Sequence, residues 1–74
     1  MQAYVDVDGD SGVAAYEIGD DFIHVQFKKG KTYRYTYASA GEHIIEQMKG
    51  LAIGGNGLNS YIMKNARTLY ESSF

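Results

Sequence analysis

The chain has 74 residues, a formal net charge of −2 and no cysteine. A chain of this length forms one domain with a small core, because a 60-residue domain buries only about 60% of its unfolded surface. The lack of cysteine excludes disulfides, thiol nucleophiles and thiolate-bound zinc. No apolar run approaches the length of a membrane span, and the first residues do not resemble a secretory signal. We therefore expect a cytoplasmic protein that has no membrane partner.

Charge is distributed unevenly along the chain. Three aspartates lie within the first ten residues, and without those ten residues the formal charge changes from −2 to +1. Three lysines and an arginine lie close together between residues 28 and 34. This balance is far from that of a strongly basic nucleic-acid binder, yet it allows a local basic patch.

Residues 1–12 form an N-terminal segment before the predicted domain of residues 13–74. Apolar residues alternate with others at its start, which fits either a short edge strand or a frayed terminus. An edge strand around Ala3-Tyr4-Val5 would offer its backbone to another chain, either a protein partner or a second copy in a homodimer.

The acidic run that follows resembles part of a calcium loop. Asp6, Asp8, Asp10 and Glu17 match the carboxylate positions of an EF-hand loop. However, Ser11 stands where the sharp turn needs glycine, and Glu17 falls in a predicted strand. We expect an acidic turn here, and the sequence predicts no metal and no cofactor.

Three segments alternate with the period of β-strands and are separated by short turns: residues 13–18, 22–27 and 32–37. The third begins with Thr-Tyr-Arg-Tyr-Thr-Tyr, which places its tyrosines on one face and Arg34 on the other. The tyrosine row has two open interpretations, a core stripe or a row of ligand contacts.

Two helices follow the strands. Ser39 with Glu42 fits a capping box, and apolar residues then recur at helical spacing up to Ala52. A glycine-rich break precedes a second apolar stripe that begins at about Leu58. The sequence predicts an α+β domain: a three-stranded antiparallel β-meander followed by two α-helices packed on one face (βββαα).

No pattern of catalytic residues is present. His24 and His43 are the only histidines, and neither belongs to a nucleophile or metal motif. The glycines before Leu58 lack the Gly-Lys-Ser/Thr ending of a phosphate-binding loop. A chain this small also has little room for a pocket. We expect a protein without enzymatic activity.

The remaining candidate is a basic surface. Lysines of the hairpin turn, together with Arg34 on the exposed sheet face, are suited to contact phosphates. Basic residues of the second helix would join them if that helix lies near the hairpin. The full candidate set is Lys28, Lys29, Lys31, Arg34, Lys64 and Arg67. The alternative is that these lysines only maintain solubility and protect a sheet edge.

Between about Ser11 and Arg67 the chain resembles the KTSC domain, named after a C-terminal appendage of some lysyl-tRNA synthetases. Tyr33-Arg34-Tyr35 matches the family's Tyr-x-Tyr, and Gly57-Leu58-Asn59 resembles its turn before an apolar helix. Many members have Val-Pro after the tyrosines, whereas this chain has Tyr37-Ala38-Ser39 and no proline.

The resemblance implies little about activity, because the family is largely uncharacterised and fold does not fix function. It implies that Tyr33 and Tyr35 are the defining pair and that Asn59 starts a helix, as a cap or as a link to the sheet. RNA binding is implied only by the attachment to a synthetase.

Two hypotheses follow. The first is an RNA-binding domain. Its base stacking would need an exposed aromatic residue, for which Tyr37 or Tyr61 is an equal alternative to Tyr33 or Tyr35. The second is a protein-interaction or self-association module that uses a sheet edge. Nucleic-acid affinity falls steeply with salt, whereas apolar association does not, so ionic strength separates them.

Overall fold

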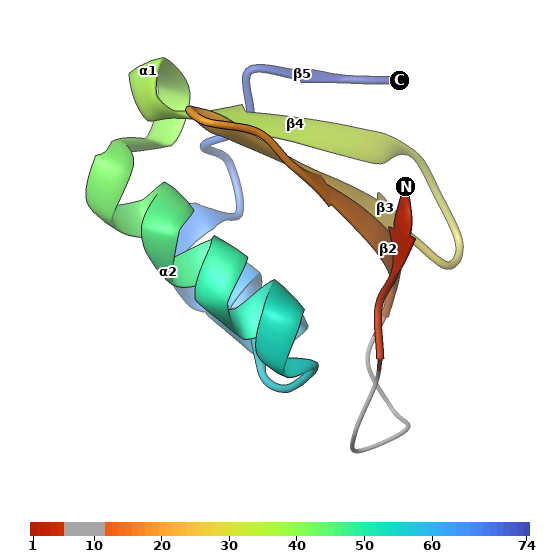
Figure 1. The fold of residues 1–74 in the computed structure, drawn as a ribbon. Helices are drawn as coiled ribbons and strands as arrows, with labels where there is room; N and C mark the ends of the chain where they lie inside the picture. Colours follow the sequence, from red (N-terminus) through yellow and green to blue (C-terminus); the bar gives the residue numbers. More distant parts are fainter. Residues whose placement is uncertain (6–11) are drawn as a thin grey trace.

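The computed structural model describes residues 1–5 and 12–74. The acidic run Asp6-Asp8-Asp10 and Ser11, on which the calcium-loop comparison rests, lies outside the described residues. The described chain forms a five-stranded antiparallel sheet whose strand order follows the sequence, and the helices lie on one side of it (Figure 1).

The strands are β1 (Gln2–Ala3), β2 (Val13–Ile18), β3 (Phe22–Phe27), β4 (Thr32–Thr36) and β5 (Ser72–Ser73). The α+β class is confirmed, and the predicted meander corresponds to β2, β3 and β4. The predicted sheet had too few strands, because both chain ends add a short strand to its edges. β4 ends at Thr36, one residue before the predicted end of the third strand, because Tyr37 begins a helix.

The helices are α1 (Tyr37–Ala40), α2 (Glu42–Gly54) and α3 (Leu58–Tyr61), which continues into the π-helical turn η1 (Ile62–Ala66). The predicted capping box at Ser39 and Glu42 is wrong. Thr36 caps α1 instead: its hydroxyl accepts from the Ser39 amide at 3.0 Å, and the Ser39 hydroxyl accepts from the Thr36 amide at 3.0 Å. Gly41, with φ of 93°, then separates α1 from α2, a conformation that favours glycine.

The core lies between the sheet and the helices. Ile23 faces Tyr35 and Val25 faces Tyr33 across the β3–β4 ladder, so these four side chains share the helix side of the sheet. Tyr35 is only 2% exposed, which makes its ring part of the core. The helices contribute the opposing buried side chains, namely Ile45, Met48, Ala52, Leu58, Ile62 and Ala66.

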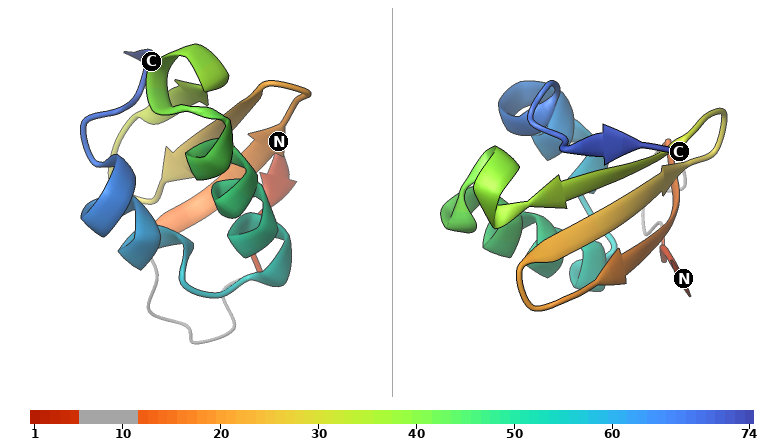
Figure 2. Two further views of the ribbon diagram at one scale, coloured as in Figure 1. Left: turned by 90° about the vertical axis from the view of Figure 1, so that its left-hand side faces the viewer. Right: turned by 90° about the horizontal axis from the view of Figure 1, so that it is seen from above.

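The other face of the sheet carries no helix among the described residues, as the two views of Figure 2 show. It presents the alternate residues of each strand. Glu17, His24, Arg34 and Ser72 lie in register across β2, β3, β4 and β5, forming a polar row. The two faces of β4 therefore serve different purposes, one apolar and one polar.

Substitution of two isoleucines of α2 tests which side of this helix faces the core. Ile45 is 0% exposed, whereas Ile53 is 69% exposed on the same helix. We expect Ile45→Ala to lower the free energy of unfolding by about 2–5 kcal/mol, because it removes buried methyl groups and leaves a cavity. Ile53→Ala should change it by less than about 0.5 kcal/mol. Urea unfolding followed by circular dichroism measures both, and equal losses would contradict the orientation of α2.

Candidate nucleic-acid interface

A pocket of about 390 Å³ lies between the hairpin turn that joins β3 to β4 and the segment that begins in η1 and continues to Tyr70. Both sides supply aromatic and basic side chains. We call it the basic aromatic pocket; its aromatic residues are Phe27, Tyr33, Tyr35 and Tyr70, and its basic residues are Lys29, Lys31 and Arg67.

The aromatic rings hold one another in place. The Tyr33 ring lies 4.8 Å from that of Tyr70 and 5.5 Å from that of Phe27, both nearly perpendicular. The Tyr35 ring lies 6.4 Å from that of Tyr70, at 89°. Edge-to-face geometry at these distances is favourable, since the ring edges are positive and the faces negative. The pocket therefore has a preformed aromatic wall, and Tyr70, 40% exposed, forms its outer part.

The basic residues of the pocket are exposed and uncompensated. Within residues 1–5 and 12–74, Lys29, Lys31 and Arg67 form no ion pair, and none of the residues that line the pocket is acidic. Cations grouped without carboxylates produce a positive potential that attracts anions. The structure thus brings together residues that are 36 to 38 positions apart in sequence, Lys29 and Lys31 with Arg67.

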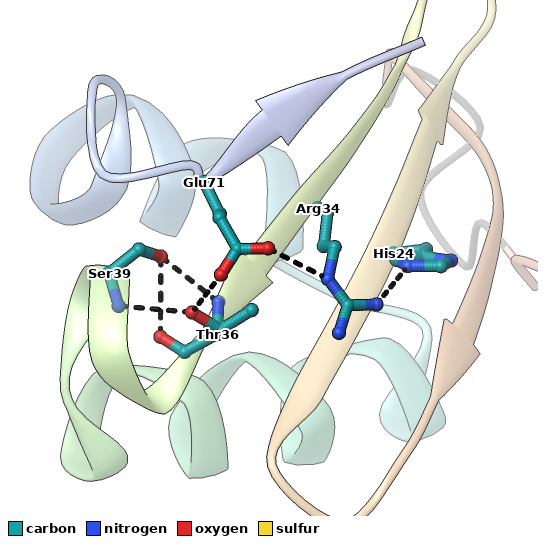
Figure 3. A network of polar contacts seen from close by, with 5 residues as sticks. All are labelled: His24, Arg34, Thr36, Ser39 and Glu71. Atoms are coloured by element: carbon teal, nitrogen blue, oxygen red, sulfur yellow. Dashed lines mark hydrogen bonds and ion pairs between the residues drawn. The ribbon is translucent and has the colours of Figure 1, made fainter.

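Arg34 lies on the opposite face of β4 from the pocket residues Tyr33 and Tyr35. Figure 3 shows it between His24 and Glu71. Its Nη1 lies 2.8 Å from His24 Nε2, and its Nε donates to Glu71 Oε1 at 3.1 Å. The guanidinium also sits over the Phe22 ring, 4.4 Å from its centroid. The predicted phosphate-binding surface combined Arg34 with the hairpin lysines; the structure separates them and gives Arg34 three intramolecular contacts.

His24 is held between an arginine and a carboxylate. A guanidinium only donates, so His24 Nε2 is the acceptor of the bond from Arg34. The other ring nitrogen, Nδ1, faces Glu17 Oε1 at 3.7 Å.

Glu71 links three elements through this network. Its second carboxylate oxygen accepts from the Thr36 hydroxyl at 3.4 Å, and Thr36 caps α1. Its backbone amide donates to the Arg34 carbonyl at 2.6 Å. Figure 3 shows the carboxylate between Arg34 and the start of α1. The network holds the C-terminal segment against β4.

Other candidate residues lie outside the pocket. Lys28 is exposed in the hairpin turn, and Lys64 is exposed on η1. The cap interpretation of Asn59 is wrong, because Gly57 is the N-cap of α3 and no side chain caps it. The Asn59 carboxamide instead lies beside Gly12, at the start of β2, which keeps it next to the sheet.

Tyr37 and Tyr61, considered above as stacking residues, do not line the pocket either. Tyr61 is half-buried against the core. The Tyr37 hydroxyl donates to Glu46 Oε2 at 2.6 Å, and Lys49 Nζ donates to the same oxygen at 2.8 Å. The bond to Glu46 raises the pKa of Tyr37 to about 12, and the bond from Lys49 lowers the pKa of Glu46.

No pattern in the sequence places Tyr70 or Phe27 in a site. Helical spacing from Leu58 predicts that Tyr70 continues the apolar stripe of the second helix, but the helical turns end at Ala66 and the chain bends back towards β4. Met63 and Thr68 also line the pocket and were not candidates. The available signal was the coincidence of a basic turn with a tyrosine row on the following strand.

Comparison of the chain with protein-family models, curated proteins and solved structures gives no match. The resemblance to the KTSC domain therefore stays a prediction. No cluster of three or more His, Asp or Glu side chains suited to a metal occurs within the described ranges 1–5 and 12–74. None of the helices in those ranges is long and apolar enough to cross a bilayer.

The Arg34–Glu71 pair can be tested by a double-mutant cycle. Arg34→Gln and Glu71→Gln should each lower the free energy of unfolding by about 0.5–1 kcal/mol, with a coupling of about 0.2–1 kcal/mol, because the pair is partly solvent-exposed. Lys64→Gln, a control without an ion pair in the described chain, should change it by less than about 0.5 kcal/mol. Strictly additive losses in urea unfolding would argue against the pair.

The tyrosines predict a loss of stability at alkaline pH. Burial, assisted by neighbouring Tyr33 and Tyr70, raises the pKa of Tyr35 from 10.0 to about 12. The neutral phenol is thus favoured in the folded state, and its stabilising effect is present below pH 10 and is lost as pH rises towards 12. Tyrosinate absorbance should show that some tyrosines ionise well above pH 10. Tyr35→Phe and Tyr37→Phe should each reduce the absorbance change in that range. Ionisation of every tyrosine near pH 10 in the folded protein would contradict it.

Proposed function

We propose that this chain is a non-enzymatic domain that binds single-stranded RNA through the basic aromatic pocket. The observation that carries the proposal is the convergence of Lys29, Lys31 and Arg67, all unpaired in the described chain, at a pocket walled by aromatic rings. The KTSC resemblance supports it by analogy only.

The two halves of the pocket match the two halves of a nucleotide. Lysine and arginine side chains hold the phosphate backbone, and they supply most of the affinity in an interaction that salt weakens. Unpaired bases stack on aromatic rings, which tolerate any base because every base has a π-face. Tyr70 is the exposed ring at the pocket, with Tyr33 next to it. The geometry thus favours Tyr33 and Tyr70 over Tyr37 and Tyr61 as stacking residues.

The test is fluorescence anisotropy with a short labelled single-stranded RNA at several salt concentrations. If each of the three cations neutralises one phosphate charge, the log–log slope of affinity against salt should be about −2, since each neutralised charge contributes about −0.7 on a single strand. Arg67→Ala should weaken binding and make the slope shallower by about 0.7. Lys64→Ala is the matched control, because it removes the same charge from η1, outside the pocket.

Two results would contradict the proposal. One is the absence of binding at low salt. The other is an equal loss of RNA affinity in Arg67→Ala and Lys64→Ala, which would show that binding depends on the net charge of the protein and not on the pocket.

The second candidate is self-association through the sheet edge. β1 is an edge strand whose residues are exposed, and Val5 beside it is 68% exposed. Because the Tyr4 amide donates inward to Ala14, the alternation of the strand directs the Ala3 amide away from β2. A dimer of this kind would persist at high salt in sedimentation analysis and would be lost in Ala3→Pro, which removes that donor. A monomer at all concentrations would exclude it.

A further inference from the structure

The pocket is lined by a tyrosine whose hydroxyl is available to a ligand. Tyr35 lines the pocket and is 2% exposed, and its hydroxyl forms no hydrogen bond with any other described residue. A phenol hydroxyl can donate one hydrogen bond and accept others, so one that lines a pocket without a partner in the described chain can bind a ligand. The phenols of Tyr33 and Tyr70 are near enough to raise the Tyr35 pKa, and they too form no hydrogen bond within the described chain.

The donors in the pocket require a ligand rich in acceptors. Phenol hydroxyls can donate to carbonyl or ring-nitrogen acceptors of a base, or to a ribose oxygen. Ammonium and guanidinium groups have no acceptors at all, so Lys29, Lys31 and Arg67 are suited to bind an anion. A planar, acceptor-bearing ring joined to a phosphate satisfies both requirements.

The positive charge at the pocket exceeds the negative charge of one phosphodiester within a strand. Three cations line a single pocket, whereas a phosphodiester carries one negative charge. A phosphomonoester carries roughly −1.5 to −2 near neutral pH and offers three acceptor oxygens. The phosphomonoester at the end of a strand is therefore the better match for the basic side of this pocket.

The size of the pocket limits how much of a strand it holds. A volume of about 390 Å³ lies near the lower end of the roughly 300–1,000 Å³ typical of small-ligand sites. One nucleotide is compatible with that volume, and a stack of several bases is not.

We propose that the basic aromatic pocket binds the phosphorylated terminal nucleotide of an RNA strand. The base lies against Tyr70 and Tyr33, the phosphomonoester lies among Lys29, Lys31 and Arg67, and the Tyr35 hydroxyl donates to the base or ribose. This inference rests on the proposed RNA binding and specifies which part of the strand enters the pocket.

The experiment uses three RNAs of one sequence: with a 5′-phosphate, with a 3′-phosphate, and with hydroxyls at both ends. Each carries its fluorescent label at an internal position. We expect one phosphorylated strand to bind about tenfold more tightly than the strand with two hydroxyl ends, and the two phosphorylated strands identify the end that is recognised. Arg67→Ala should abolish this preference, whereas Lys64→Ala should retain it.

A second pair of variants tests the Tyr35 hydroxyl without changing charge. Tyr35→Phe removes this hydroxyl and keeps the ring, and it should weaken binding of the preferred strand several-fold. Tyr61→Phe makes the same change on a half-buried tyrosine outside the pocket and should have no effect. Unfolding by urea, measured on both, establishes that the fold is retained.

The outcomes separate this inference from the proposed function. Equal, salt-sensitive binding of all three RNAs would overturn the inference and leave RNA binding intact. A preference for a phosphorylated end that persists in Arg67→Ala would also overturn it, because that end would then bind elsewhere. No binding of any RNA at low salt would overturn the proposed function, and the inference with it.

Discussion

Alternation along β4 assigns its side chains to two different environments. Tyr33 and Tyr35 point towards the helices, where Tyr35 is buried against the core, and Arg34 points to the uncovered face. A β-strand cannot shift its register by one residue without exchanging these sets, and here that would bury a guanidinium and expose two tyrosines. The core, the pocket and the polar network all depend on this one register.

The polar network on one face contributes to the site on the other. Glu71 is held by the Arg34 side chain and by the Arg34 carbonyl, and β5 pairs with β4 immediately afterwards. Tyr70 precedes Glu71 directly, so fixing Glu71 at the edge of β4 also fixes the position of Tyr70, whose ring packs on Tyr33. Arg34 thus positions the pocket from a distance and does not line it.

Two groups of basic side chains differ in whether the protein itself supplies their partners. Arg34 and Lys49 are engaged by carboxylates and backbone or imidazole acceptors, and their exposure is low for their type. Lys29, Lys31 and Arg67 are left unpaired in the described chain, side by side around aromatic rings. Desolvating a cation is costly without an anionic partner, so exposed, unpaired cations that share a concave site are suited to an anion from outside.

Local pattern was sufficient for part of this structure. β2 and β3 have the predicted bounds, and β4 and the apolar side of α2 follow from period 2 and period 3.6 in the sequence, because burial of one face imposes those periods. The sequence also identified the hairpin lysines and Tyr33 and Tyr35 as candidates, and it identified Arg67 on the condition that its helix approached the hairpin.

The rest was decided by contacts between distant segments. β1 and β5 have two residues each and are strands through pairing with the edges of the meander. The sequence left an edge strand or a frayed terminus open for the segment that contains β1, and it had no pattern that indicated β5. The end of the helical turns at Ala66 and the return of the chain to β4 brought Tyr70 and Arg67 to the hairpin. The sequence by itself determined which faces are apolar and where the charges lie; only the tertiary structure decided which cations meet which rings, because that depends on where the chain turns back.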